Sequence, residues 1–297
     1  MTTDVQVLPW AEAGSNARQL LSRHYAIYTT CTSREMLSNL PGYMEAARDN
    51  YLRITGLTDR PAEGRMPIYM MATRREWSDL TRSVVGKQWN VYSALEAGGY
   101  CYKGVCVFWD TGGVGSLAIA SHEGLHQFLG RRLKDHLPMW AEEGLATLAE
   151  GYQVRGNAVR FTPQRNASRF TDLRNAILND WWIPLDKLLA MDAGDAVRPG
   201  DSGRAVGYSG QLWALAIMLM TDPVLAPRRA RMLADAEDGL FDRALGLAPG
   251  TLARSRPESR AYNRRVSVPL FKHYIAADLV GFEQKYKAFA GKLARTD

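Results

Sequence analysis

The chain is poor in cysteine and has no long apolar run. Its 297 residues include only three cysteines, too few for a fold stapled by several disulfides. No stretch approaches the roughly 18 uninterrupted apolar residues of a membrane-spanning helix, so we expect no transmembrane segment. Internal repeats and low-complexity segments are also missing from the sequence, which excludes repeat proteins. Hydrophobic residues still make up 46% of the chain, enough for a sizeable core.

The N-terminus lacks the features of an export signal. The first 20 residues have neither the charged start nor the apolar run of a signal peptide. We therefore expect residues 1–20 to be a tail, either of a cytoplasmic protein or of one whose leader has been removed.

The three cysteines do not decide the compartment. Cys101 and Cys106 flank residues 102–105, which predict a hairpin turn, so a disulfide between them is geometrically feasible. Three reduced thiols fit the sequence equally well, and the pairing stays open. Two further ligands for a structural zinc site are missing near this pair, and no cysteine has an identifiable histidine partner for catalysis.

Positive charge predominates, with a net charge of +6. Arginines gather at residues 228–231 and 254–265, but only Tyr262 stands among the second group as a stacking aromatic. Nucleic-acid binding would need interleaved aromatics on one surface. We therefore interpret these arginines as a solvated face and expect no nucleic-acid partner.

Histidine is scarce too, yet two of the five histidines fall in one short motif. His122-Glu123-Gly124-Leu125-His126 lies in a stretch that predicts a helix from an N-cap at Ser116 to Gly130. Residues four apart share a helix face, so His122 and His126 present two imidazoles to one point. Glu123 lies beside that point, as a general base for metal-activated water would.

Gly124 conflicts with this helix, because an interior glycine costs about 1 kcal/mol relative to alanine. We expect Gly124 to allow close packing against a neighbouring element.

A catalytic zinc site needs a third protein ligand. Pro138 opens a second predicted helix that ends near Gly151. Its carboxylates at Glu142, Glu143 and Glu150 are the candidates.

The motif H-E-x-x-H followed by W-x-x-E-G-L-A, in residues 121–149, resembles gluzincin-type zinc metallopeptidases, especially the peptidase MA-like families. The resemblance implies Glu143, directly before Gly144, as the third ligand of one catalytic Zn²⁺. Thr147 lies one turn further along the same helix face, where we expect it to orient His122 or Glu143. We expect Glu150 to be a solvated or helix-end carboxylate. Relatives of this type are often exported, which favours an extracytoplasmic location if a leader was removed.

Weaker likeness extends over other segments. Strands are expected at His24–Cys31 and Met66–Ala72, with a helix through Met44–Leu52. Tyr208 and Trp213 resemble a Tyr-x-x-x-x-Trp helix of those families. We take Tyr208 as the expected oxyanion donor, with His136 second and Tyr152 third.

The resulting expectation is an α+β, zincin-like fold. Its divisions are an N-terminal tail (1–20), an α/β subdomain with a substrate-edge strand at Val105–Asp110 (21–115), a zinc-binding helical catalytic subdomain (116–222) and a C-terminal helical region (223–297). The expected activity is hydrolysis of a peptide or protein substrate by metal-activated water with Glu123 as base. The oligomeric state and the cleavage specificity stay open.

The sequence allows two other interpretations. Residues 110–118 follow an apolar strand and superficially match a dinucleotide-binding glycine fingerprint, but the helix after them carries the two histidines instead of starting a βαβ unit. A catalytically silent zincin-fold protein, with a binding or structural role in the cell envelope, remains the alternative function.

Overall fold

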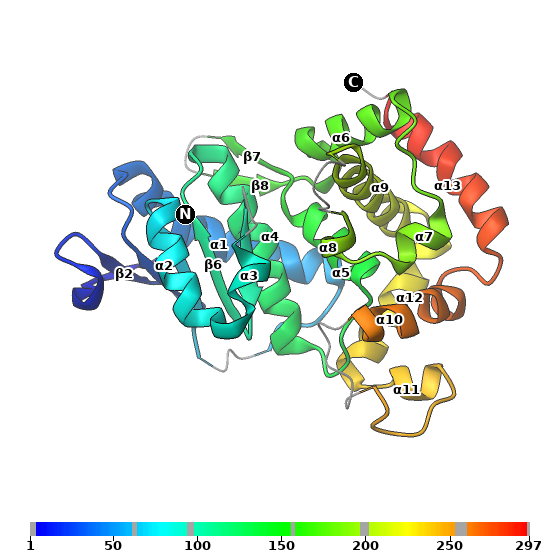
Figure 1. The fold of residues 1–297 in the computed structure, drawn as a ribbon, viewed down its shortest axis with the longest axis horizontal. Coiled ribbons are helices and arrows are strands. Elements are labelled where there is room, and N and C mark those ends of the chain that lie inside the picture. The colour runs from blue at the N-terminus through cyan, green and yellow to red at the C-terminus, as the bar shows by residue number, and fades with distance from the viewer. Residues whose placement is uncertain are drawn as a thin grey trace. The chain divides into compact units, whose positions relative to one another are not determined.

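The computed structural model describes residues 4–60, 64–93, 98–155, 158–196, 202–252 and 260–295. The chain forms two compact units. The first comprises Met1–Arg53, Thr58–Arg131 and Tyr152–Phe161, and the second comprises Ile54–Leu57, Arg132–Gly151 and Thr162–Asp297. This division cuts the chain at other positions than the expected boundaries near residues 115 and 222. Both α-helices and β-sheets are present, as the α+β class requires (Figure 1).

The first unit is built on a six-stranded sheet of order β1-β2-β3-β4-β6-β5. Strands β3, β4 and β6 run parallel, and the remaining pairs are antiparallel. The strands are β1 (Gln6–Pro9), β2 (Arg18–Leu21), β3 (Tyr25–Thr29), β4 (Met66–Met71), β5 (Gly99–Tyr102) and β6 (Val105–Trp109). A separate antiparallel pair in the same unit consists of β7 (Tyr152–Arg155) and β8 (Ala158–Phe161). The strands expected at His24–Cys31 and Met66–Ala72 are confirmed as β3 and β4.

Helices cover both faces of this sheet. The helical segments of the unit are η1 (Ala11–Ala13), α1 (Arg34–Thr55), α2 (Arg74–Val85), η2 (Gly86–Gln88), α3 (Trp89–Tyr92) and α4 (Gly113–Arg132). Alternate residues of β6 point to opposite faces, as in any strand. Cys106 and Phe108 pack with α1 and α4, whereas Val107 and Trp109 pack with Trp77 of α2. The helix expected through Met44–Leu52 is the second half of α1.

The prediction that residues 1–20 form a tail is wrong for most of these residues. β1 and β2 form a hairpin whose register pairs Gln6 with Leu21 and Pro9 with Arg18, and β2 continues onto β3. Leu20 is buried in the core of the sheet. The error arose because β1 is short and exposed, and so carries little hydrophobic alternation.

The predicted substrate-edge strand is also misplaced. Val105–Asp110 corresponds to β6, which lies between β4 and β5, so its backbone hydrogen-bonding groups are used on both sides. The strand at this edge of the sheet is β5. Because the hairpin turn at residues 102–105 pairs β5 with β6, β5 takes the edge position and β6 becomes an inner strand.

The second unit is helical. Its segments are α5 (Met139–Ala149), η3 (Pro163–Arg165), α6 (Ala167–Leu178), α7 (Leu185–Ala190), α8 (Ala193–Ala196), α9 (Ser202–Thr221), α10 (Leu225–Asp238), α11 (Phe241–Ala244), α12 (Arg260–Tyr274) and α13 (Leu279–Leu293). The buried helix α9 packs against α5 and α6.

Among the described residues, no single helix is long and apolar enough to cross a membrane. Two consecutive segments reach the length and apolar composition of a membrane span only when taken together, namely Gly203–Thr221 and Leu225–Asp238. The chain bends by 101° between them.

Candidate metal centre

The helix that carries the H-E-x-x-H motif begins earlier than expected. α4 starts at Gly113 and runs to Arg132, so Ser116 lies in its first turn instead of capping it. The Ser116 hydroxyl donates a hydrogen bond to Asp110 Oδ1 at 2.6 Å and accepts one from the Thr111 backbone N–H at 2.9 Å. Its side chain therefore fixes the connection between β6 and α4.

Three polar contacts hold the middle of α4 within the first unit. The Tyr51 hydroxyl donates to the backbone carbonyl of Ser121 at 2.7 Å, and the Tyr43 hydroxyl donates to Ser121 Oγ at 2.9 Å. Cys106 Sγ donates to the carbonyl of Glu123 at 3.1 Å. These contacts reach the helix on either side of His122, from α1 and from β6. Sequence reasoning missed both tyrosines, because a tyrosine on an amphipathic helix ordinarily indicates core packing.

Gly124 faces α1, as its close-packing role requires. A Cβ atom added there would lie 2.5 Å from Tyr51 Oη and 2.7 Å from Met44 Cε. Real Cβ atoms do not come this close to other heavy atoms. The expectation of close packing at this glycine is thus confirmed.

The two imidazoles of the motif share one side of α4. The ring centroids of His122 and His126 are 5.0 Å apart, with 65° between the ring planes. Both side chains are half-buried, whereas the intervening Glu123, Gly124 and Leu125 are buried. Glu123 is only 8% exposed.

Glu143 lies in the first half of α5, which the second unit anchors firmly. The Met139 N–H donates to Asn263 Oδ1 at 2.9 Å, and the buried Trp140 ring packs edge-on against Phe271. At Gly144, an added Cβ would lie 3.3 Å from Ala216 Cβ and 3.4 Å from the Leu212 carbonyl of α9. The glycine after Glu143 therefore allows α5 and α9 to approach closely.

Glu150 lies at the end of α5, as one of the two expected alternatives had it, but its carboxylate is not solvated. Arg169 donates to both of its oxygens, at 2.8 and 2.9 Å, and Asn166 Nδ2 donates to Oε2 at 2.9 Å. The Glu150 side chain is only 7% exposed. This carboxylate is therefore engaged in a buried ion pair.

Thr147 does not orient a ligand in the expected way. Its hydroxyl donates to the carbonyl of Gly144 in the same helix, at 2.7 Å. Back-bonding of this kind is common for threonine within helices.

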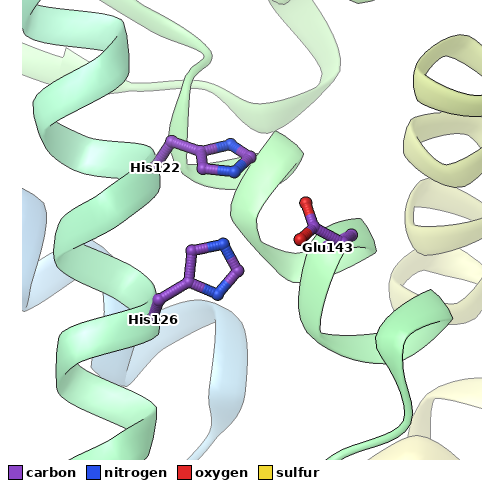
Figure 2. Close-up of side chains that lie close together, drawn as sticks. All are labelled: His122, His126 and Glu143. Carbon is purple, nitrogen blue, oxygen red and sulfur yellow. The ribbon is translucent and has the colours of Figure 1, made fainter. Parts of the chain in front are cut away.

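His122, His126 and Glu143 form a group that could hold a metal ion. Each offers one ligand atom, and these atoms all lie within 4.8 Å of one another. Figure 2 shows both imidazoles projecting from the same side of α4 and the Glu143 carboxylate directed towards them. Two imidazoles and a carboxylate are a donor set typical of catalytic zinc, although other divalent cations accept the same ligands.

Tyr208, the expected oxyanion donor, lies on α9 and is only 4% exposed. Its hydroxyl has no hydrogen-bond partner among the described residues. Burial raises the pKa of this phenol well above its ordinary value, and the nearby carboxylates of Glu143, Asp192 and Asp195 raise it further. The phenol therefore keeps its proton at neutral pH and is a hydrogen-bond donor with no acceptor in the described part of the chain.

The two other donor candidates are placed differently. The Tyr152 hydroxyl donates to the carbonyl of Val114 at 3.2 Å, and its ring packs on Tyr43 and Phe161. His136 is exposed, with its ring edge-on to Tyr262. Of the three candidates, Tyr208 is the one with a buried and unused hydroxyl.

The arginine-rich segments only partly match a solvated face. Arg228 donates to the Ile275 carbonyl at 2.7 Å, and Arg229 donates to the carbonyl of Ile54. Burial lowers the pKa of Arg229, so this side chain is structural. Residues 254–259 of the second segment lie outside the described residues, and Arg260 pairs with Asp192 at 3.1 Å.

Comparison with known proteins finds no matching family model, no matching curated protein and no matching solved structure.

Proposed function

We propose that this protein is a zinc-dependent peptidase of the gluzincin type with a zincin-like fold. The observation that carries the proposal is the convergence of His122, His126 and Glu143, whose ligand atoms lie within 4.8 Å of one another. The resemblance of the motif supports the same proposal, but it gives no distance between Glu143 and the two histidines.

The donor set fits the metal. Zinc binds imidazole nitrogens at about 2.0–2.1 Å and carboxylate oxygens at about 2.0–2.2 Å, and catalytic sites use three such protein ligands. Separations below 4.8 Å bring the three donor atoms within reach of one ion after minor side-chain rotation. Zinc held there would supply a Lewis acid that makes water nucleophilic near neutral pH.

Glu123 is the general base of this proposal. It follows His122 directly on α4, and the residue is buried. In this role it takes a proton from the attacking water and passes it to the amine that leaves. The Cys106 contact to the Glu123 carbonyl and the Tyr51 contact to the Ser121 carbonyl hold this turn in place.

Tyr208 is the hydrogen-bond donor for the developing oxyanion. Its hydroxyl is buried, protonated and without a partner among the described residues. A buried donor left unsatisfied costs about 1–3 kcal/mol. Such a cost is understandable if a substrate oxygen accepts the hydrogen bond during the reaction.

The edge strand β5 is available for pairing with a peptide substrate. It is the last strand of the sheet, and its outer backbone groups pair with no other strand among the described residues. At Gly99, where β5 begins, an added Cβ would lie 3.2 Å from Ile119 Cγ2 of α4. The beginning of β5 is therefore packed one helical turn from His122, so a peptide added to this edge would run close to the histidines.

The test separates metal binding from hydrolysis. Glu123→Gln should retain zinc but lose about 10²–10⁴-fold in peptide hydrolysis, which is the usual contribution of a general base. Glu142→Gln, which changes a neighbouring carboxylate on α5, is the control and should retain both. If zinc-loaded Glu123→Gln matches wild type on every substrate of a peptide library, the hydrolase proposal fails and a silent binding protein remains.

A further inference from the structure

Two cysteines face each other across the β5–β6 hairpin. Cys101 and Cys106 are register partners, one pair inward from the turn at Lys103 and Gly104. Both turn residues have positive φ, 50° and 76°, which is the signature of a two-residue type I′ turn. All three cysteines, which lie in the described part of the chain, are free thiols.

The position of this pair in the ladder suits a cross-link. A two-residue turn is closed by a hydrogen-bonded pair, here Tyr102 and Val105. Since the two types of pair alternate, Cys101 and Cys106 form a non-hydrogen-bonded pair, with Cα atoms roughly 4.5 Å apart. Disulfides span Cα separations of about 4.4–6.8 Å. The bond can therefore form without moving the strands.

The directions of the two cysteine side chains also favour a cross-link. Cys106 is fully buried, and Cys101 is partly buried against the same core cluster, so both thiols point to the face that packs on α1 and α4. Burial raises the pKa of the Cys106 thiol well above its ordinary value, and the nearby Cys101 thiol raises it further. Gln127 Nε2 donates to the Gly104 carbonyl at 2.7 Å, which ties the turn to α4 and keeps the two strands in register.

We propose that Cys101 and Cys106 are a reversible dithiol–disulfide site that cross-links the edge strand β5 to β6. The partly exposed Cys101 thiolate attacks a small disulfide such as oxidised glutathione, which forms a mixed disulfide and releases one glutathione thiol. Cys106 then gives up its thiol proton to base in solution, and its sulfur attacks Cys101 Sγ, which closes the intramolecular bond and releases the second glutathione thiol. Two protein thiols are thus oxidised while one glutathione disulfide is reduced.

Oxidation of Cys106 also removes a hydrogen bond that holds α4. The Cys106 thiol that donates to the Glu123 carbonyl loses its hydrogen when the disulfide forms. The site rests on the hairpin geometry alone and is independent of the proposed hydrolysis.

The experiment uses the full-length protein, reduced and then incubated with excess oxidised glutathione at about pH 8.5, near the ordinary pKa of a cysteine thiol. Intact mass, thiol titration and peptide mapping are the readouts. We expect the mass to fall by two hydrogen atoms, the thiol count to fall from three to one, and mapping to link Cys101 to Cys106. Cys31→Ser, the matched control, should form the same cross-link, and Cys106→Ser should stop at a glutathione adduct on Cys101.

Three results would overturn the proposal. They are retention of three thiols by wild type, a wild-type glutathione adduct on Cys101 that is never resolved, and cross-linking between chains through Cys101. If Cys106→Ser does not fold, the wild-type mass and peptide map still decide between these results and the intramolecular bond.

Discussion

The hydroxyl of Tyr51 donates a hydrogen bond to the backbone carbonyl of Ser121 over 2.7 Å. This contact joins α1 to the turn of α4 that begins the H-E-x-x-H motif. Tyr51 is fully buried, and its ring packs against Phe128 at a centroid distance of 5.6 Å. The placement of His122 thus depends on a side chain from a distant part of the sequence.

Gly124→Ala should damage this arrangement. The new Cβ would lie 2.5 Å from Tyr51 Oη, so α1 and α4 would have to separate or the tyrosine would have to move. We expect a loss of about 1–3 kcal/mol in the free energy of unfolding, as for other overpacked sites. Chemical denaturation measures it.

Gly130→Ala is the matched control on the same helix. Nothing lies within 4 Å of a Cβ added at Gly130, so this change should be neutral or stabilise by up to about 1 kcal/mol. Equal destabilisation by the two variants would contradict the packing role of Gly124.

Tyr208→Phe should separate activity from stability. The phenylalanine keeps the ring and removes a buried hydroxyl that has no partner among the described residues. We expect the free energy of unfolding to stay the same or to rise by about 1 kcal/mol, because no hydrogen bond is lost. Turnover on a peptide substrate should fall by about 10²–10³-fold, as at other oxyanion donors. Unchanged turnover would assign Tyr208 a packing role only.

Substitution of Glu143 by glutamine should reduce zinc binding, whereas the same substitution of Glu150 should reduce stability. Glu150→Gln breaks a buried ion pair with Arg169, which typically costs about 3–5 kcal/mol. It should leave the zinc content of the folded protein unchanged. Glu143→Gln should lower zinc affinity. Loss of zinc from Glu150→Gln alone would show that the third ligand has been assigned to the wrong carboxylate.

Acid should weaken the first unit through Glu45. Burial raises the pKa of this carboxyl, but hydrogen bonds from the His24 side chain, Ser22 and the His24 N–H outweigh burial and lower it overall. The folded-state pKa therefore lies below the unfolded value of about 4.3. The stability that Glu45 contributes is complete above about pH 5 and is lost as the pH falls through the folded-state value.

Denaturation of wild type between pH 6 and pH 3 measures this loss. Glu45→Gln should show a weaker pH dependence over that range than wild type. Glu35→Gln, an exposed carboxylate on the same helix, should match wild type. If Glu45→Gln and wild type lose stability in parallel, the contribution of Glu45 is refuted.

The local parts of the candidate site could be predicted from the sequence. Helix periodicity places His122 and His126 on one face, and an interior glycine at Gly124 indicates a close approach. Both depend only on neighbouring residues and on helix geometry. The strands β3 and β4 were also predicted, because they are buried runs of apolar residues.

Features that depend on distant partners could not be predicted. Glu150 forms a buried ion pair with Arg169, and the sequence of α5 alone gives no sign of this partner. Strand order is set by pairing in space, so the sequence could not show that β5 lies outside β6. The N-terminal hairpin was missed because β1 is mostly exposed and pairs along only four residues.

Zinc stoichiometry tests the central claim most directly. Wild type and the variants Glu123→Gln, Glu142→Gln, His126→Ala and Glu143→Gln should be stripped with a chelator, reloaded with zinc, dialysed and measured by elemental mass spectrometry. We predict about one zinc per chain for wild type, Glu123→Gln and Glu142→Gln, with marked loss in the two ligand variants. Wild type that holds no stoichiometric zinc, or folded ligand variants that hold as much as wild type, would contradict the account.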